Sequence, residues 1–150
     1  MRFQCRGENV FITGEAGTGK SFVLGRAVAA LRSSGKQVQI TAMTGVAAEL
    51  VGGTTIHAVC GFGVPKTVAD FNKMLFADTK ERLQQCCDVL VIDEVSMLSG
   101  ELFDRIDELL RRLKQKAGQP SRPFGGTQMV VSPQAICRLW CFGPILTDCS

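Results

Sequence analysis

Short unbroken apolar runs and longer stripes with helical spacing alternate along this chain. Residues 10–13, 37–41, 89–92 and 127–132 have the length and composition expected of buried strands. The run at 89–92 contains only valine, leucine and isoleucine, which is typical of a parallel strand buried on both faces. Strands that alternate with helices predict an α/β fold, in which right-handed βαβ units build a parallel sheet.

One helix is predicted between the first two strands and another directly after the second strand. Residues 21–34 have helical periodicity, and Gly35 is expected to end this helix. A shorter helix is expected over residues 45–51, where the glycine pair 52–53 ends it. The apolar stripe of the first helix consists of Leu24, Ala27, Val28 and Leu31.

The longest predicted helix lies between the third and fourth strands, from a cap at Ser99 to about residue 117. Two more helices are expected before the third strand, one from Thr67 to Leu75 and one over about 78–86. A loop rich in glycine and proline covers residues 118–126. The long helix has a charged face with Asp104, Glu108 and Arg112, and an apolar stripe of Leu102, Phe103, Ile106, Leu109, Leu110 and Leu113.

Composition and charge fit one folded domain. The 150 residues are 45% hydrophobic and 21% charged, which is ordinary for a globular protein with its own core. The net charge of +3 is too small to indicate nucleic-acid binding by itself. No apolar run approaches the roughly 18 residues of a membrane span, and the first strand begins too early for a targeting peptide. We therefore expect no membrane partner, and the cysteine content described next favours an intracellular protein.

Residues 133–150 differ in character from the rest of the chain. They contain the only tryptophan, Trp140, and show no clear strand or helical period. Three of the seven cysteines lie here, and they lack the C-x-x-C spacing of a zinc site. The odd number of cysteines in the whole chain favours reduced thiols over a disulfide framework. We therefore expect the folded unit to cover residues 1–132, followed by a separate tail. The tail cysteines are Cys137, Cys141 and Cys149.

A glycine-rich loop joins the first strand to the first helix. Residues 14–21 read G-E-A-G-T-G-K-S, the pattern of a phosphate-binding loop in its required setting of strand, loop and helix. The backbone N–H groups of such a loop surround phosphate oxygens, and the helix dipole adds to the attraction. Lys20 would contact the β- and γ-phosphates, and Ser21 would ligate Mg²⁺. The predicted ATP-binding residues are Gly14, Glu15, Ala16, Gly17, Thr18, Gly19, Lys20 and Ser21.

An acidic pair, Asp93 and Glu94, follows the third apolar run. In a fold with a phosphate-binding loop, an acid at the carboxyl end of a strand is placed to hold Mg²⁺, which assigns the metal side to Asp93. Glu94 can act as a general base on the attacking water. This glutamate favours a RecA-like ATPase over a GTPase. The N-K-x-D motif of GTPases is also absent, because residues 72–75 read N-K-M-L and lack the final aspartate. A P-loop kinase of small metabolites stays as a minor alternative.

Five ordered segments resemble the petite-integration-frequency (Pif) DNA helicases, RecD-related members of helicase superfamily one. They are residues 7–14, T-A-M-T-G-V-A-A at 41–48, G-G-T-T-I-H at 52–57, V-I-D-E-V-S-M-L at 91–98 and F-G-G-T-Q-M-V-V at 124–131. The resemblance implies an incomplete RecA-like domain of the P-loop NTPase class, with the last predicted strand between the loop strand and the Asp93 strand. It also implies ATP as the substrate, Mg²⁺ as the cofactor, and 5′-to-3′ movement along single-stranded DNA by two motor domains.

The same resemblance assigns DNA contacts. Thr44 and Gly45 are expected to contact the DNA backbone, as are Thr55 and His57. Hydroxyl and backbone N–H groups at helix starts suit phosphates and read no base sequence. His57 is the only histidine; the residues alone favour a structural role for it, and the resemblance makes a role in DNA contact about equally open. For a protein of a eukaryote, the resemblance implies the nucleus or mitochondrion, with roles in DNA repair, recombination and telomere maintenance.

The resemblance ends after residue 132. Members of the family continue with G-D-F-x-Q-L-P-P, whereas residues 133–137 read P-Q-A-I-C. The second motor domain with its arginine finger is missing. An upstream helix that carries an adenine-reading glutamine is missing as well, and Gln4 lies too near the first strand to replace this glutamine. We therefore expect a helicase fragment that binds nucleotide at most and unwinds nothing. The alternative is a non-enzymatic nucleotide- or DNA-binding remnant of a truncated or mis-spliced gene.

Overall fold

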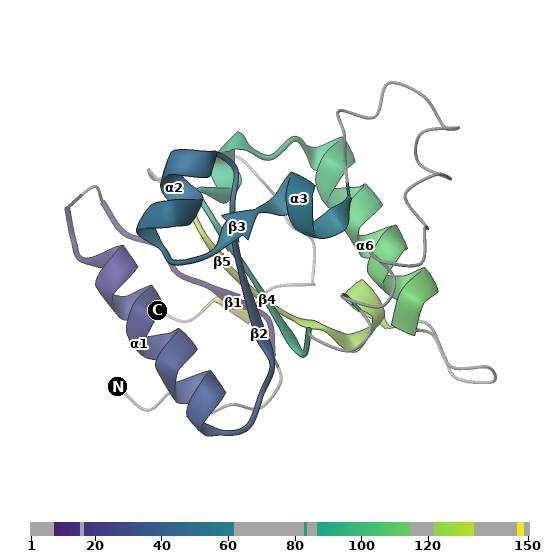
Figure 1. The fold of residues 1–150 in the computed structure, drawn as a ribbon, viewed down its shortest axis with the longest axis horizontal. Helices are drawn as coiled ribbons and strands as arrows, with labels where there is room; N and C mark the ends of the chain where they lie inside the picture. Colours follow the sequence, from purple (N-terminus) through teal and green to yellow (C-terminus); the bar gives the residue numbers. More distant parts are fainter. Residues whose placement is uncertain are drawn as a thin grey trace.

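A parallel sheet forms the centre of the molecule (Figure 1). The computed structural model describes residues 8–15, 17–61, 83, 87–114, 122–133 and 147–148. The strands are β1 (Val10–Phe11), β2 (Val38–Ala42), β3 (Thr54–Thr55), β4 (Val89–Asp93), β5 (Gln128–Ser132) and β6 (Thr147–Asp148). Their order across the sheet is β3-β2-β4-β5-β1-β6, and every pairing among these described strands is parallel. The predicted α/β class and parallel sheet are confirmed.

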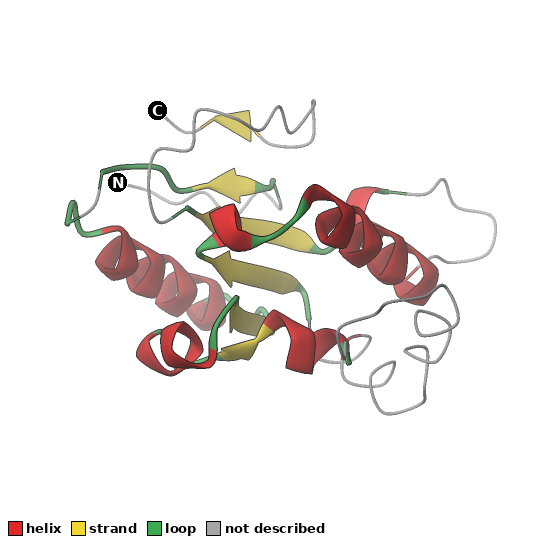
Figure 2. Cartoon of the chain, turned by 90° about the horizontal axis from the view of Figure 1, so that it is seen from above, coloured by secondary structure: helices red, strands yellow, loops and turns green. Residues whose placement is uncertain are grey.

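Helices cover both faces of this sheet. Seen from above, α1 lies on one face and α6 on the other (Figure 2). The helices predicted at 21–34 and 45–51 are confirmed to within one residue at each end. The helices and short 3-10 turns are α1 (Lys20–Ser33), α2 (Gly45–Leu50), α3 (Ile56–Cys60), η1 (Val95–Met97), α6 (Gly100–Lys114) and η2 (Pro123–Gly126).

The position of β5 in the sheet confirms one expectation from the resemblance, because it separates the loop strand β1 from the acid strand β4. The prediction of a buried strand over residues 10–13 was too long. β1 contains two residues, both only half-buried, since among the described strands only the two-residue β6 lies beyond it. β3 and β6 were not predicted, because two residues are too few to show a strand period.

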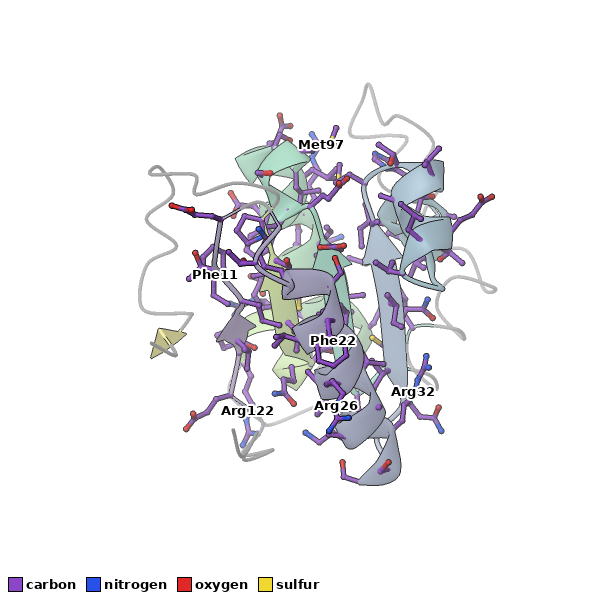
Figure 3. All side chains as sticks on the ribbon, turned by 90° about the vertical axis from the view of Figure 1, so that its left-hand side faces the viewer. Phe11, Phe22, Arg26, Arg32, Met97 and Arg122 are labelled. Carbon is purple, nitrogen blue, oxygen red and sulfur yellow. The ribbon has the colours of Figure 1, made fainter. Side chains whose placement is uncertain are left out.

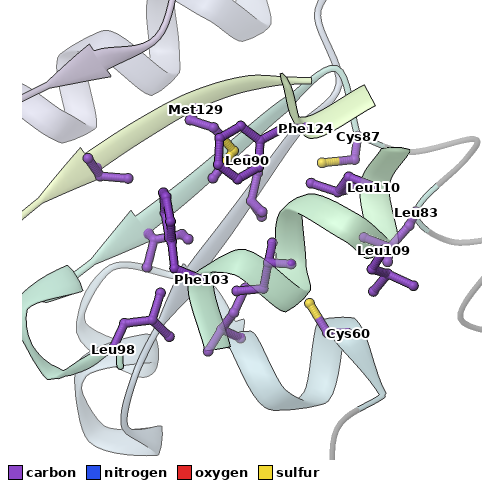
Figure 4. Packing of buried hydrophobic residues seen from close by; sticks show 14 of the residues in the cluster. Cys60, Leu83, Cys87, Leu90, Leu98, Phe103, Leu109, Leu110, Phe124 and Met129 are labelled. Carbon is purple, nitrogen blue, oxygen red and sulfur yellow. The ribbon is translucent and has the colours of Figure 1, made fainter. Parts of the chain in front are cut away.

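The sheet buries a different set of side chains on each face. The predicted stripe of α1 is buried, and three of its members, Leu24, Val28 and Leu31, pack with side chains from β2, β4 and β5. These strand residues are Ile40, Val89, Val91 and Val130. On the opposite face, Leu90 and Ile92 of β4 join Met129 and Val131 of β5 in a second cluster with α6 (Figure 4).

The long helix α6 is capped and buried largely as its sequence predicted. Its cap is Ser99, whose Oγ accepts a hydrogen bond from the backbone N–H of Leu102 at 3.2 Å. Leu102 is only partly buried, but the rest of the stripe is buried, and the ring of Phe103 meets that of Phe124 edge-on at 5.1 Å (Figure 4). The polar face carries three ion pairs at i,i+4 spacing, Glu101–Arg105, Asp107–Arg111 and Glu108–Arg112.

Some predicted elements lie outside the described residues. These are the helices expected at 67–75 and 78–86, apart from Leu83, which is helical and buried. Most of the tail also lies outside them, although its residues 147–148 form β6 beside β1. Among the helices that are described, none has the length and apolar character needed to cross a membrane.

Candidate functional site

The predicted site residues gather at one edge of the sheet. In a parallel sheet all carboxyl ends face the same way, so the segments that leave β1, β2, β3, β4 and β5 share this edge. The register aligns Asp93 with Ala42 on one side and with Ser132 on the other. The glycine loop begins beside them, because the backbone N–H of Ile12 donates to the carbonyl of Val131 at 2.9 Å.

The glycine loop links β1 to α1, as its sequence predicted. Thr18 closes it on itself, since its Oγ1 donates to the carbonyl of Glu15 at 2.8 Å. The Lys20 ammonium lies against the loop and donates to the carbonyls of Gly14 at 2.7 Å and Glu15 at 2.9 Å. Gly19 caps α1 at φ 84°, a conformation that costs a residue with a Cβ about 1–2 kcal/mol. Of the predicted loop residues, only Ala16 lies outside the described part.

The acidic pair forms a sharp turn at the end of β4. Asp93 is the last residue of the strand, and its Oδ1 accepts a hydrogen bond from the backbone N–H of Glu94 at 3.0 Å. Glu94 has φ 58° and ψ 39°, which is the left-handed region. A glutamate there is strained by about 1–3 kcal/mol, and such strain clusters at functional sites. Both side chains are half-buried, so the edge of the sheet exposes part of each carboxylate.

Alternation along the strands places Asp93 on the α1 face of the sheet. Val89 and Val91 of β4 pack with α1, whereas Leu90 and Ile92 pack on the α6 side. Because side chains alternate between faces, Asp93 follows the valines. The acid therefore shares a face with the helix that begins at Lys20. One strand lies between β4 and β1, so their backbones are about 10 Å apart.

Ser132 is a residue at this edge that sequence reasoning missed. It ends β5, it is buried, and it pairs in register with Asp93. Val130 packs with α1, so the alternation that applies to Asp93 also places Ser132 on the α1 face. The sequence contained one sign of this residue. In a strand predicted to be central, the polar Ser132 follows Val130 by two positions, so the two share one face of the sheet.

The residues predicted to contact DNA lie together at the β2 and β3 end of the same edge. Thr44 caps α2 and Thr55 caps α3, and each Oγ1 accepts a backbone N–H at 3.2 Å, from Ala47 and Ala58 respectively. The two helix starts are neighbours, because β2 and β3 pair in parallel. Gly45 is exposed, and His57 is half-buried within α3.

A family comparison identifies the chain. The model of the family described as PIF1-like helicase matches residues 2–135. The chain belongs to the PIF1-like helicase family. Among curated PIF1-like relatives, the ATP-dependent DNA helicase PIF1 of Xenopus laevis is 43% identical over 128 residues, which are 83% of this chain and 19% of that protein. The prediction of the family from five sequence segments is confirmed.

Solved PIF1-like structures agree with this assignment. The Pif1 helicase from Candida albicans matches with a TM-score of 0.75 and 37% identity, over 85% of this chain and 29% of that one. The Bacteroides Pif1 helicase in complex with ADP-AlF3 and ssDNA matches with a TM-score of 0.71 and 35% identity, over 87% and 29%. The RecA-like fold prediction is therefore confirmed. The chain spans about a fifth of the length of the curated relatives it matches.

Proposed function

We propose that this chain is the nucleotide-binding portion of an ATP-dependent DNA helicase, and that by itself it binds Mg-ATP without unwinding DNA. One observation carries the proposal. The glycine loop joins a strand to a helix at the same sheet edge, and on the same face, at which β4 ends in Asp93. The names of the relatives, which include ATP-dependent DNA helicases and a complex with ADP-AlF4, support ATP as the ligand.

In this proposal the loop holds the triphosphate. The N–H groups of residues 14–21 surround the phosphates, and Lys20 exchanges its bonds to the Gly14 and Glu15 carbonyls for bonds to phosphate oxygens. The exchange is favourable because a charged phosphate is a stronger acceptor for an ammonium than a neutral carbonyl is. A lysine already lying against the loop needs little reorganisation to bind.

The residues at the edge also fit a magnesium ion. Mg²⁺ prefers oxygen ligands, and it binds through one or two carboxylates together with the phosphates of a substrate. In this proposal Ser21 supplies one hydroxyl and Asp93 supplies one carboxylate. The described residues contain no group of three or more metal-ligating side chains, and a magnesium ion bound in this way does not require one. The bound ion would neutralise charge on the phosphates. Glu94, next in sequence to the metal-side acid, would act as the general base that orients and deprotonates the attacking water.

Single-stranded DNA is proposed to bind at the starts of α2 and α3. The hydroxyls of Thr44 and Thr55 accept N–H bonds from their own helices, which leaves each hydroxyl hydrogen free to be donated to a phosphate. Gly45 offers an exposed backbone at the start of α2, and His57 lies in the first turn of α3. Such contacts are independent of base sequence, as a translocating protein requires. A complex of Bacteroides Pif1 with ssDNA supports this class of partner.

Exposed apolar side chains support a covering domain in the longer protein. Among the described residues, the exposed large hydrophobic side chains lie on α1, α2 and η1, which all follow the carboxyl ends of strands. Figure 3 shows Met97 at the end of the molecule opposite Arg32 and Arg122, and Phe22 nearer the middle, on α1. We propose that a second motor domain covers this side and supplies an arginine finger, a group worth about 10³–10⁵ in rate in related enzymes. The exposed set is Phe22, Val46, Leu50 and Met97.

The 150-residue chain alone should therefore hydrolyse ATP very slowly. A non-enzymatic remnant is the second candidate, favoured by the P-Q-A-I-C sequence that follows β5 in place of the family motif. The two candidates differ in whether single-stranded DNA stimulates hydrolysis when the downstream domain is present. Since DNA is the proposed partner, we infer an intracellular place of action, with the nucleus or mitochondrion as the specific proposal for a eukaryote.

The test is binding of a fluorescent ATP analogue to the purified chain, with Mg²⁺ or with EDTA. Lys20→Ala should weaken binding by about 10- to 150-fold, the value of a charge-assisted hydrogen bond. Asp93→Asn should weaken binding only with Mg²⁺. Arg32→Ala is the matched control, because it removes one positive charge from the last turn of the same helix. Equal binding by the wild type and Lys20→Ala would exclude the glycine loop as the nucleotide site.

A further inference from the structure

Ser132 combines burial with a position inside the proposed nucleotide site. The residue is 2% exposed, and it lies on the middle strand, between the glycine-loop strand and the acid strand. The parallel register pairs it directly with Asp93, about 5 Å away across the strands. Its hydroxyl therefore lies next to the metal-side carboxylate, on the face of the sheet that α1 covers.

Another buried hydroxyl shows what a purely structural role looks like in this sheet. Thr41 is fully buried, and its Oγ1 donates to the carbonyl of Val91 in the neighbouring strand at 2.7 Å. No hydrogen bond of the Ser132 hydroxyl is found among the residues that the structure describes, although the fully buried side-chain atom without a partner in this part of the chain is Thr127 Oγ1 and not this hydroxyl. The Ser132 hydroxyl is therefore available to bond to a polar ligand at this edge of the sheet.

The other polar residue of β5 on this face is already occupied elsewhere. Gln128 lies at the opposite end of the strand, where it accepts from Lys36 Nζ at 2.8 Å and donates to the carbonyl of Glu8 at 2.7 Å. It ties the amino edge of the sheet together and cannot reach the carboxyl edge. Ser132 is thus the polar side chain that the middle strand presents to the site.

The chemistry of magnesium gives such a hydroxyl a use. Mg²⁺ loses its waters reluctantly and keeps several of them when it binds through one carboxylate and phosphates. Groups outside the ligand shell then orient the ion through these waters. A serine hydroxyl can both donate and accept, so it suits a water between two strands. One oxygen of Asp93 is already held by the backbone N–H of Glu94.

We propose that Ser132 is a positioning residue that holds the hydrated magnesium ion of the bound nucleotide beside Asp93. The proposal rests on the nucleotide-binding function proposed above, and it concerns only the metal-dependent part of binding. Ser132 does not contact the reacting atoms. It fixes the water shell at the junction of β4 and β5, so its loss should reduce the benefit that Mg²⁺ gives to nucleotide affinity.

The experiment compares the dissociation constant of a fluorescent ATP analogue in EDTA with that in Mg²⁺, for the full 150-residue chain. Ser132→Ala should lower this ratio by about 3- to 10-fold, the size of one neutral hydrogen bond, and leave the constant in EDTA unchanged. Ser132→Cys, which keeps the volume with a weak donor, should behave like alanine. Ser132→Thr should restore the ratio to within about twofold of the wild type, because it keeps the hydroxyl.

Thr127→Val is the matched control. Thr127 directly precedes β5, and its buried hydroxyl likewise has no partner among the described residues, but it lies at the amino edge, away from the site. This variant should leave the ratio unchanged, and thermal melting should show all four variants folded. An unchanged ratio in both Ser132→Ala and Ser132→Cys overturns the inference, as does an equal loss in EDTA. A wild-type ratio of one would instead overturn the proposed metal site itself.

Discussion

Because Glu94 has a left-handed backbone conformation, we predict that substitutions at this position affect stability and activity separately. Glu94 has φ 58° and ψ 39°, and glycine adopts these angles without the steric cost that a Cβ brings. Glu94→Gly and Glu94→Ala both remove the carboxylate proposed as the general base. Only the glycine variant also removes the backbone strain. The difference in the free energy of unfolding between the two variants therefore reports that strain.

The expected magnitude follows from two opposing terms. Relief of left-handed strain favours glycine over alanine by about 1–2 kcal/mol. The greater freedom of glycine in the unfolded chain opposes this by about 0.4–1 kcal/mol. At the middle of both ranges, Glu94→Gly is more stable than Glu94→Ala by about 0.8 kcal/mol. In a domain of this length, that difference raises the melting temperature by about 1–4 °C.

Urea unfolding, monitored by the change in helical circular dichroism, measures the difference if both variants share one m-value. Asp104 supplies the control, because it is exposed and lies inside α6, where φ is negative. There glycine should be less stable than alanine by about 1 kcal/mol, the opposite sign. ATP hydrolysis of the longer helicase should be lost equally in both Glu94 variants.

If Glu94→Gly is no more stable than Glu94→Ala while the Asp104 pair shows its expected order, the turn after β4 is not strained in solution. Retention of hydrolysis by either Glu94 variant would remove the general-base role and leave the strain argument standing.

Three further predictions concern stability. Gly125→Ala should destabilise the fold by about 2–4 kcal/mol in urea, because Gly125 has φ +59° and an added Cβ would lie 2.3 Å from the carbonyl of Leu110. Thr127→Val should raise stability by up to about 1 kcal/mol, since it removes a buried hydroxyl that has no partner in the described part of the chain; a loss would reveal a bond there. Burial, with a smaller contribution from Cys87, raises the pKa of the Cys60 thiol from 9.0 to about 12. The folded state thus favours the neutral thiol, and its contribution to stability is complete below pH 9.0 and falls as the pH rises toward about 12. Mass spectrometry after alkylation should find Cys60 protected in the folded chain and modified in urea.

Much of the fold was predictable because strong local signals agreed with the global arrangement. The glycine loop required a strand before it and a helix after it, and the stripe of α1 was long enough to define one face. The apolar run of β4 predicted a strand buried on both sides, and Asp93 then marked its carboxyl end. Together these local signals are sufficient to locate the candidate nucleotide site along the chain.

Other features depend on tertiary context that sequence periodicity does not carry. The turn of η2 places Phe124 and Gly125 at positive φ, and for a bulky residue only packing against α6 can maintain that conformation. Ser132 reads in the sequence as the end of a strand. Its place beside Asp93 depends on the pairing of β4 with β5, and this register arises only when the sheet assembles.

The central place of β5 has a topological consequence for whatever follows it. A chain that leaves the carboxyl end of β5 must first pass between the glycine loop, which follows β1, and the turn at Asp93 and Glu94, which follows β4. Exchanging the segment after residue 132 therefore changes the carboxyl edge of the sheet at the proposed nucleotide site, even though every residue upstream of the junction is retained.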